Sequence, residues 1–160
     1  MQTSKWIRIR ALRPSDFGFI RRLASRQTDF TVPPLYVLWL LKRTNPRSCL
    51  IAEHPKHGPL AYLLAVLGAR STEKTLYVWQ LATSKLGKRV GATDMVLLAL
   101  RDFVRKEKVR TVLFTVEPGS SKFRAIRRYA YSLSARGCQA RKFLPKFVSR
   151  NEREYIVRVM

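Results

Sequence analysis

The feature that most constrains the fold is a nearly continuous apolar run, residues 75–84 (TLYVWQLATS), that leads through a short glycine-containing segment into a helical stretch. Such a run is typical of a strand covered on both faces, so we expect a central strand. Apolar residues recur at helical spacing over 91–107, and a second buried strand is expected at 110–118. The chain must therefore build a sheet around a strand–helix–strand unit.

The remaining segments extend this sheet and cover it. Residues 48–53 and 59–70 flank the polar turn HPKHG and predict an antiparallel hairpin. A strand at 7–12 precedes a helix capped by Asp16, and a second helix follows Pro33-Pro34. That second helix (LYVLWLLKR) is apolar nearly all round and should pack deeply or line a pocket. A helix at 120–133 and two closing strands complete a single predicted domain, 1–160.

Charge is the unusual part of the composition. The chain has 32 Lys and Arg against 10 Asp and Glu, a net charge of +22. Such a field attracts polyanions (RNA, DNA or the ribosome), although a generally basic solvated surface is the simpler interpretation. Cys49 and Cys138 predict free thiols of a reducing compartment. No metal site is expected, and no apolar run is long enough for a membrane span, so we expect a cytoplasmic protein.

The segment KLGKRVGA (85–92) joins the central strand to the next helix. Unpaired N–H groups at a helix N-terminus, together with the helix dipole, favour a bound phosphate. Arg89 stands in the middle of the segment, where phosphate-binding loops often carry a glycine. If that position needs a positive φ, Arg89 is strained; if its φ is helical, Arg89 fits and adds a charge. The alternative is an ordinary basic turn.

Three stretches resemble the GNAT N-acetyltransferases, and among them the L-2,4-diaminobutyrate acetyltransferases of ectoine synthesis. They are YVWQLATS with the glycine segment after it, TDF with LYVLWLL and SCLIAE, and TVEPGSSKFRAIRRYA. The similarity in element order covers nearly the whole chain. It implies an α/β (α+β), GNAT-like fold, with a mixed, mostly antiparallel, twisted sheet of about seven strands and about four helices. It also implies an acetyl-CoA-dependent enzyme, with a homodimer as a family-level expectation.

The resemblance implies a cofactor site in which the central strand pairs with pantetheine and the glycine segment wraps the pyrophosphate. The family pattern there is (Gln/Arg)-x-x-Gly-x-(Gly/Ala), which this chain meets at its last glycine and departs from at Leu86 and Arg89. A basic residue of the helix at 120–133 would meet the 3′-phosphate. The implied cofactor-binding residues are Leu81, Ala82, Thr83, Gly87, Lys88, Arg89, Val90, Gly91, Ala92, Ser120 and Arg124.

Acetyl transfer needs a polarised carbonyl, a neutral amine and a proton for the departing thiolate. The resemblance implies the backbone N–H of Leu81 for the carbonyl. It implies a tyrosine acid near 127–128, and Tyr129 lies one or two places later. Tyr36 is a second candidate near the thioester, or a core residue. No carboxylate stands on the central strand, so a base must be water or an acid from elsewhere.

The acceptor would enter at the segment between the first two helices. Asp29 matches an acidic position of the diaminobutyrate enzymes and would hold the amine, or else cap a helix end. Trp79 would wall the acceptor pocket or belong to the core, and Glu117 would line the pocket or be a turn residue. Glu53 is a further acid near a strand end.

Two classes of function follow. The first is an N-acetyltransferase acting on a primary amine, such as the small diamino acid 2,4-diaminobutyrate. Its variant acts on an amine carried by a nucleic acid or the ribosome, which a net charge of +22 suits better. The second is a GNAT fold without catalysis that serves as a basic nucleic-acid-binding module.

Overall fold

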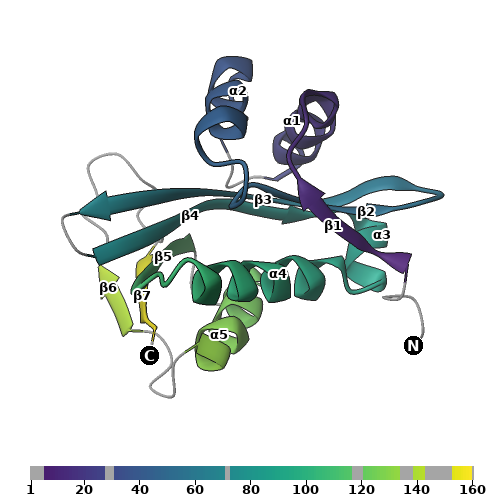
Figure 1. Ribbon diagram of the computed structural model, residues 1–160. Helices are drawn as coiled ribbons and strands as arrows, with labels where there is room; N and C mark the ends of the chain where they lie inside the picture. The colour runs from purple at the N-terminus through teal and green to yellow at the C-terminus, as the bar shows by residue number, and fades with distance from the viewer. Residues whose placement is uncertain are drawn as a thin grey trace. The chain divides into compact units, whose positions relative to one another are not determined.

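The computed structural model describes residues 6–27, 31–70, 73–116, 121–133, 139–142 and 153–159 (Figure 1). The predicted order of strands and helices is confirmed over these residues, with one short helix added. The strands are β1 (Arg8–Ala11), β2 (Leu50–His54), β3 (Gly58–Arg70), β4 (Glu73–Thr83), β5 (Thr111–Val116), β6 (Gln139–Lys142) and β7 (Arg153–Arg158). The helices are α1 (Phe17–Ser25), α2 (Leu35–Thr44), α3 (Lys85–Arg89), α4 (Ala92–Lys106) and α5 (Ser121–Leu133), with a 3-10 turn, η2, at Pro14–Asp16.

The strands form one sheet in the order β1-β2-β3-β4-β5-β7-β6. The β1–β2, β2–β3, β5–β7 and β6–β7 pairs are antiparallel, whereas β4 and β5 are parallel. The parallel pair is the one that helix α4 connects, as a strand–helix–strand unit requires. The predicted mixed, mostly antiparallel α/β sheet is confirmed, and β4 is its central strand.

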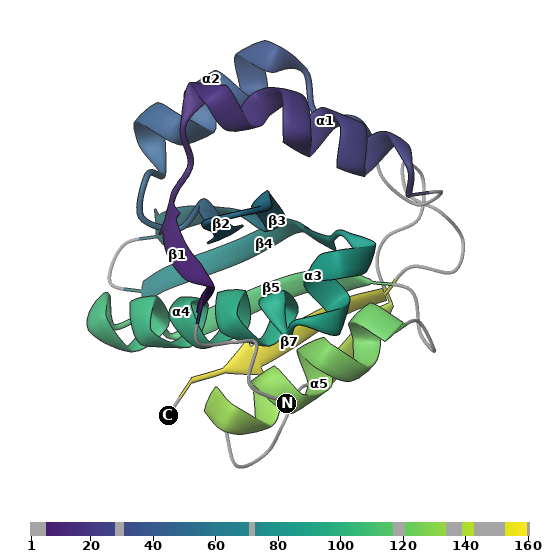
Figure 2. The ribbon, with the colours of Figure 1, turned by 90° about the vertical axis from the view of Figure 1, so that its right-hand side faces the viewer.

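The chain divides into two compact units. The first unit comprises Met1–Val66 and Gln80–Leu100, and the second comprises Leu67–Trp79 and Arg101–Met160. In the first unit, α1 and α2 lie on one face of the strands, while α3 and the start of α4 lie on the other (Figure 1, Figure 2). Leu63 and Leu64 of β3 are both fully buried. Because neighbouring strand residues point to opposite faces, β3 is covered on both sides.

Helix α2 differs from its prediction. Leu38 and Leu41 are buried, but Leu35, Trp39 and Leu40 are exposed large side chains. The guanidinium of Arg43 lies 4.7 Å from the centre of the Trp39 ring, a cation–π contact at the surface. An all-round apolar sequence therefore buries one stripe only, since a helix on the outer side of a sheet has a single face to pack.

The N-terminal strand carries an ion cluster that local sequence patterns do not predict. The Arg10 guanidinium binds Asp16 through Nη1 and Nη2, both at 2.7 Å, and Glu53 through Nε (2.8 Å) and Nη2 (3.0 Å). Asp16 was expected to cap α1, but its side chain makes no cap bond to that helix and instead accepts from the backbone N–H of Arg13 at 2.8 Å. We call Arg10, Asp16 and Glu53 the Arg10 cluster.

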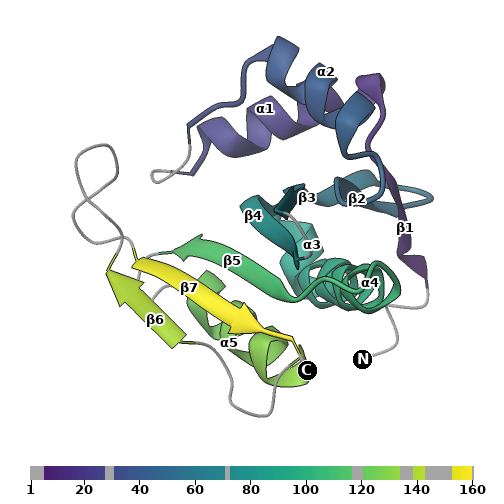
Figure 3. The same cartoon turned by 60° about the vertical axis from the view of Figure 1, so that its left-hand side comes forward.

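The second unit packs α5 beside β5 and β7 (Figure 3). Val112, Phe114 and Val157 are buried in it. Its α4 segment ends at Lys106. Just beyond it, Lys108 has a φ of 54°, and the next residue, Val109, donates its N–H to the Val104 carbonyl at 2.9 Å. A left-handed residue just past a helix is the usual device for turning the chain, here into β5.

Two smaller expectations concern the cysteines and the HPKH turn. Cys49 is a free, buried thiol whose pKa burial raises to about 11, whereas Cys138 lies outside the described residues. The HPKH segment forms the predicted β2–β3 turn, with the ring centres of His54 and His57 4.8 Å apart. Over the described part of the chain, no helix has the length and apolar content needed to cross a bilayer.

Candidate active site

The last residues of β4 belong to the first unit and are buried in it. Leu81, Ala82 and Thr83 are buried, together with Gln80 before them. For the described residues, the parallel register with β5 runs from Thr75 to Val78, and β4 continues to Thr83. The predicted cofactor strand is therefore a real strand with buried side chains, whose last residues lie beyond that register.

The segment expected to be a loop, 86–91, is mostly a helix. α3 spans Lys85–Arg89 and is capped by Ser84, whose hydroxyl oxygen accepts the N–H of Gly87 at 3.0 Å. The N–H of Ser84 is itself donated to the Leu60 carbonyl of β3 at 2.8 Å, and the Ser84 carbonyl accepts from Lys88 N at 2.9 Å. The N–H of Gly87, in the first turn of α3, is thus satisfied by the side chain of its cap residue.

Two glycines of this segment have different physical roles. A Cβ on Gly87 would lie 2.7 Å from the Leu60 carbonyl oxygen and 2.8 Å from Thr83 Cγ2, so Gly87 allows α3 to approach β3. Gly91 has a φ of 79° with open space around it, so it allows the reversal from α3 into α4. Arg89 lies within α3 and has an ordinary helical backbone. The positive φ falls at Gly91, and Arg89 is unstrained.

Helix α4 presents its N-terminus at this junction. The carbonyl of Gly91 accepts the N–H of Met95 at 3.2 Å, which makes Ala92 and Thr93 first-turn residues whose N–H groups lack intrahelical acceptors. The Thr93 hydroxyl lies 2.8 Å from the Thr83 hydroxyl and ties this turn to the end of β4. Lys88 and Arg89 are exposed beside it, and Asp94 adds one opposing charge in the same turn. The arrangement suits a phosphate bound by backbone amides.

Outside this junction, the other predicted site residues have varied placements. Tyr36 is 68% exposed on α2, which is inconsistent with a core role. Trp79 on β4 is half-buried, and Arg124 on α5 is exposed. Asp29, Glu117 and Ser120 lie outside the described residues.

Tyr129, the other candidate acid, is buried in the second unit at 5% exposure, with its ring edge-on to Phe114 at a centroid distance of 5.8 Å. Its hydroxyl is buried and has no hydrogen-bond partner among the described residues. Burial raises the pKa of Tyr129 well above its usual range, while Arg101 and Arg105 of α4 lower it in part. The phenol is protonated at neutral pH, and the raised pKa makes it a weaker proton donor than a free tyrosine.

Glu53, considered above as a possible base, belongs to the Arg10 cluster. Hydrogen bonding to Arg10 is the main cause that holds the pKa of Glu53 below its usual value. Both carboxylate oxygens are engaged by the guanidinium, at 2.8 Å and 3.0 Å. A carboxylate in this state is a poor proton acceptor, so Glu53 has a structural role.

A buried polar group that pattern-based reasoning passed over is Gln80. Its Oε1 accepts from the Tyr62 hydroxyl at 3.1 Å, and its Nε2 donates to the Thr31 carbonyl at 2.8 Å. The sequence did carry a signal for this contact, namely a glutamine inside an apolar run. A glutamine buried in a strand needs hydrogen-bond partners for its amide, and these must come from other elements.

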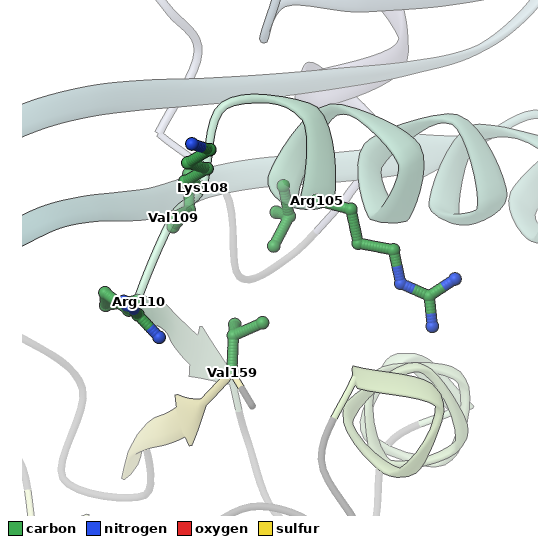
Figure 4. Close-up of a pocket in the computed structure, with 6 residues that line it drawn as sticks. Arg105, Lys108, Val109, Arg110 and Val159 are labelled. Atoms are coloured by element: carbon green, nitrogen blue, oxygen red, sulfur yellow. The ribbon is translucent and has the colours of Figure 1, made fainter.

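The second unit also holds a cavity of about 210 Å³, which is not a convincing active site (Figure 4). Arg105 points toward α5 and donates to the Ser132 carbonyl at 3.2 Å, while Lys108 and Arg110 point in different directions. The charges that line it therefore do not converge on one point. Its lining residues are Val104, Arg105, Lys108, Val109, Arg110 and Val159.

No protein-family model matches the sequence, and no curated protein matches it. Solved structures do match across nearly the whole chain. Ard1 from Thermoplasma volcanium has a TM-score of 0.78 at 16% identity, over 97% of this chain and 98% of its own. The diaminobutyrate acetyltransferase EctA from Paenibacillus lautus, in complex with L-2,4-diaminobutyric acid and coenzyme A, has a TM-score of 0.78 at 22% identity, over 96% and 95%.

A third similar structure is Naa50 from Arabidopsis thaliana, in complex with the bisubstrate analogue CoA-Ac-MVNAL. Its TM-score is 0.71 at 10% identity, over 94% of this chain and 97% of its own. At these identities the likeness establishes the fold. The chain has the fold of the GNAT N-acetyltransferases, as the resemblance in the sequence implied.

Proposed function

We propose that the protein is an acetyl-CoA-dependent N-acetyltransferase. The observation that carries the proposal is the junction from β4 through α3 to α4, where Gly91 turns the chain at a φ of 79° and directs the N-terminus of a 15-residue helix beside Lys88 and Arg89. The fold supports it, since similar structures include enzymes in complex with coenzyme A or a CoA-containing analogue.

In this proposal, acetyl-CoA is a substrate held mainly by backbone groups. The strand residues Leu81, Ala82 and Thr83 pair with the pantetheine chain, and the amides of Gly91 and Ala92 meet the pyrophosphate. Lys88 and Arg89 add charge beside it, with Gly87 and Val90 shaping the turn. Ser120 and, on α5, Arg124 are assigned to the phosphate side of CoA. Binding through backbone amides tolerates Leu86 and Arg89 at motif positions, because any residue except proline supplies an N–H.

The chemistry is a direct transfer. A neutral amine attacks the thioester carbonyl, the C–N bond forms, the C–S bond breaks, and the thiolate takes a proton. The N–H of Leu81 stabilises the carbonyl oxygen as its charge grows. Tyr129 is our first choice for the proton donor because its buried hydroxyl has no hydrogen-bond partner among the described residues, and Tyr36 is the second. Asp29, Trp79 and Glu117 are proposed to receive the acceptor.

Two acceptor classes remain in the proposal. The first is a small diamino acid, which local sequence resemblance and the EctA structure support. The second is an amine carried on a polyanion or a peptide N-terminus, which the net charge of +22 and the peptide-derived analogue on Naa50 support. A basic protein repels a free cationic diamine at long range, whereas it attracts a ribosome or RNA. We propose a cytoplasmic location for either.

The first test is calorimetric titration with acetyl-CoA, followed by a thiol-release assay with 2,4-diaminobutyrate, the peptide Met-Val-Asn-Ala-Leu and an aminoacyl-tRNA. We expect acetyl-CoA to bind and one amine to release CoA thiol. Failure to bind acetyl-CoA, combined with salt-sensitive RNA or DNA binding, would replace the enzyme with a basic binding module.

The choice of acid has its own test. Tyr129→Phe should lower kcat by roughly 100-fold while the affinity for acetyl-CoA stays the same. The same variant should keep or raise the melting temperature, since it removes a buried hydroxyl that has no partner among the described residues. Tyr36→Phe is the matched variant at an exposed position. If Tyr36→Phe loses the activity and Tyr129→Phe keeps it, the assignment is reversed.

A further inference from the structure

Gln80 sits inside the first unit as a buried amide with a hydrogen bond at each end. It is 5% exposed, yet it lies on β4 immediately before Leu81. Its oxygen receives the Tyr62 hydroxyl at 3.1 Å, and its nitrogen donates to the backbone carbonyl of Thr31 at 2.8 Å. A buried amide in an apolar strand costs free energy unless it is paired, so this pairing accounts for its presence.

The orientation of the amide is set by Tyr62. That side chain is fully buried on β3, and its ring stands edge-on to Phe19 of α1, with centroids 6.4 Å apart and an interplanar angle of 88°. The ring contact fixes where the hydroxyl points. Because the hydroxyl donates to the amide oxygen, the amide NH₂ group must face Thr31.

Thr31 belongs to the connection between α1 and α2, residues 26–34. This connection ends in Pro33 and Pro34, which carry no backbone N–H. The Gln80–Thr31 bond joins residues 49 positions apart in the sequence and holds Thr31, near the described end of the connection, against β4. The point of attachment is one residue from the proposed carbonyl-binding N–H of Leu81.

We propose that Gln80 is a positioning residue for the amine acceptor. This inference rests on the proposed acetyltransferase function and concerns the same site. Gln80 touches neither substrate; it fixes residues 31–34, at the end of the α1–α2 connection, against β4, so that an amine held beside these residues meets the thioester carbonyl at Leu81. A neutral amide is required, because a carboxylate at this position would face the Thr31 carbonyl oxygen with no proton to donate.

Kinetics of two variants test the role. Gln80→Leu keeps the size and removes both hydrogen bonds, and it should raise the KM for the amine about tenfold while the KM for acetyl-CoA moves little. Gln80→Glu should behave similarly at pH 8 and recover toward pH 6, relative to wild type at the same pH. The buried carboxyl takes a proton in that range and then donates to Thr31. The probe is whichever of 2,4-diaminobutyrate and Met-Val-Asn-Ala-Leu is turned over.

Ser48→Ala is the matched control. Ser48 is buried in the same unit and donates to the Ala65 carbonyl at 2.9 Å, remote in sequence from both Thr31 and Gln80. It should lower stability without changing the ratio of the two KM values. Equal rises of both KM values in Gln80→Leu, or the same ratio change in Ser48→Ala, would overturn the positioning role.

Hydrogen–deuterium exchange of residues 26–36 tests the Gln80–Thr31 tether without an activity assay. Exchange should rise in Gln80→Leu and rise less in Tyr62→Phe, because the latter leaves the Gln80–Thr31 bond possible. Unchanged exchange in Gln80→Leu would overturn the inference even if the protein is an acetyltransferase. Faster exchange with no acetyl-CoA binding by the wild type would refute the proposed function and, with it, the assignment to an acceptor, leaving only a structural tether.

Discussion

Arg10 and Arg89 represent two regions of the first unit that are built on different principles. Arg10 is almost buried, with 8% of its side chain exposed, and two donor edges of its guanidinium are occupied by carboxylates. Arg89 is exposed on α3, at a junction shaped by two glycines. In the Arg10 cluster the structure depends on the charged side chains that are present. At the junction it depends on the backbone conformation that the two glycines allow.

This difference separates two uses of positive charge in a protein with a net charge of +22. In the Arg10 cluster, the charge of one arginine is paired with two carboxylates of the protein and stabilises the fold. At the junction, Lys88 and Arg89 leave their charge at the surface, where it is available to an anion. Total charge therefore says little about function until each cation is placed.

The largest expected effect comes from breaking the Arg10 cluster. Arg10→Met would leave Asp16, which has 2% of its side chain exposed, without its cation. We expect a loss of about 3–5 kcal/mol in the free energy of unfolding, measured in urea. Arg8→Met on the same strand, at an exposed position, should change it by less than about 0.5 kcal/mol. Similar losses in both variants would show that the Arg10 cluster contributes no more to the free energy of unfolding than an exposed arginine does.

The junction should respond to changes in backbone freedom. Gly87→Ala forces a Cβ to within 2.7 Å of the Leu60 carbonyl oxygen, and should cost about 1–3 kcal/mol by overpacking. Gly91→Ala meets open space and should cost only about 1 kcal/mol, from the positive φ. Thermal unfolding of the two variants checks the order. A reversed order would mean that α3 can move away from β3 at little cost.

Acid should weaken the Arg10 cluster. Glu53 has a folded-state pKa below its ordinary value of 4.5, chiefly because of its hydrogen bonds to Arg10. A carboxylate with a lowered pKa contributes stability above its unfolded-state pKa and loses it as the pH falls through the folded-state value. Unfolding free energies from pH 7 to pH 3 should therefore fall more steeply in wild type than in Glu53→Gln. Parallel curves would contradict this.

The smallest effect is expected at Arg89. Arg89→Ala should leave stability unchanged and weaken acetyl-CoA binding about two- to fivefold, an effect that shrinks as salt is added. Calorimetry at low and high salt measures it. Arg21→Ala, an exposed position on α1 across the sheet, is the matched control (Figure 2). An equal loss in that variant would assign the effect to overall charge rather than to the junction.

Sequence reasoning worked best where one strong pattern dominates. The apolar run 75–84 and the helical run after it predicted β4, α4 and the central position of β4, because burial on both faces leaves an unmistakable pattern. It failed at α3, since a helix of five residues has too few positions to display a period. It also left open whether position 89 has a positive φ, which the structure places at Gly91 instead.

Long-range polar contacts were beyond the reach of local patterns. Asp16 looked like a helix cap because it precedes an apolar helix, but its partners are the Arg10 guanidinium and the Arg13 N–H. Arg10 in turn binds Glu53, 43 positions further along the chain. Which strand lies beside which decides such contacts, and β1–β2 pairing appears only in three dimensions. The same holds for Gln80 and Thr31, which are 49 positions apart.

The short helix α3 has a consequence for how such a protein changes over evolutionary time. In α3, Gly87 is restricted by close packing, and just beyond the helix Gly91 is restricted by its φ. The exposed Lys88 and Arg89 can be replaced by most residues without moving the chain. A lineage can therefore lose the recognisable sequence motif while it keeps the same backbone turn. Structural similarity then persists after sequence similarity has been lost.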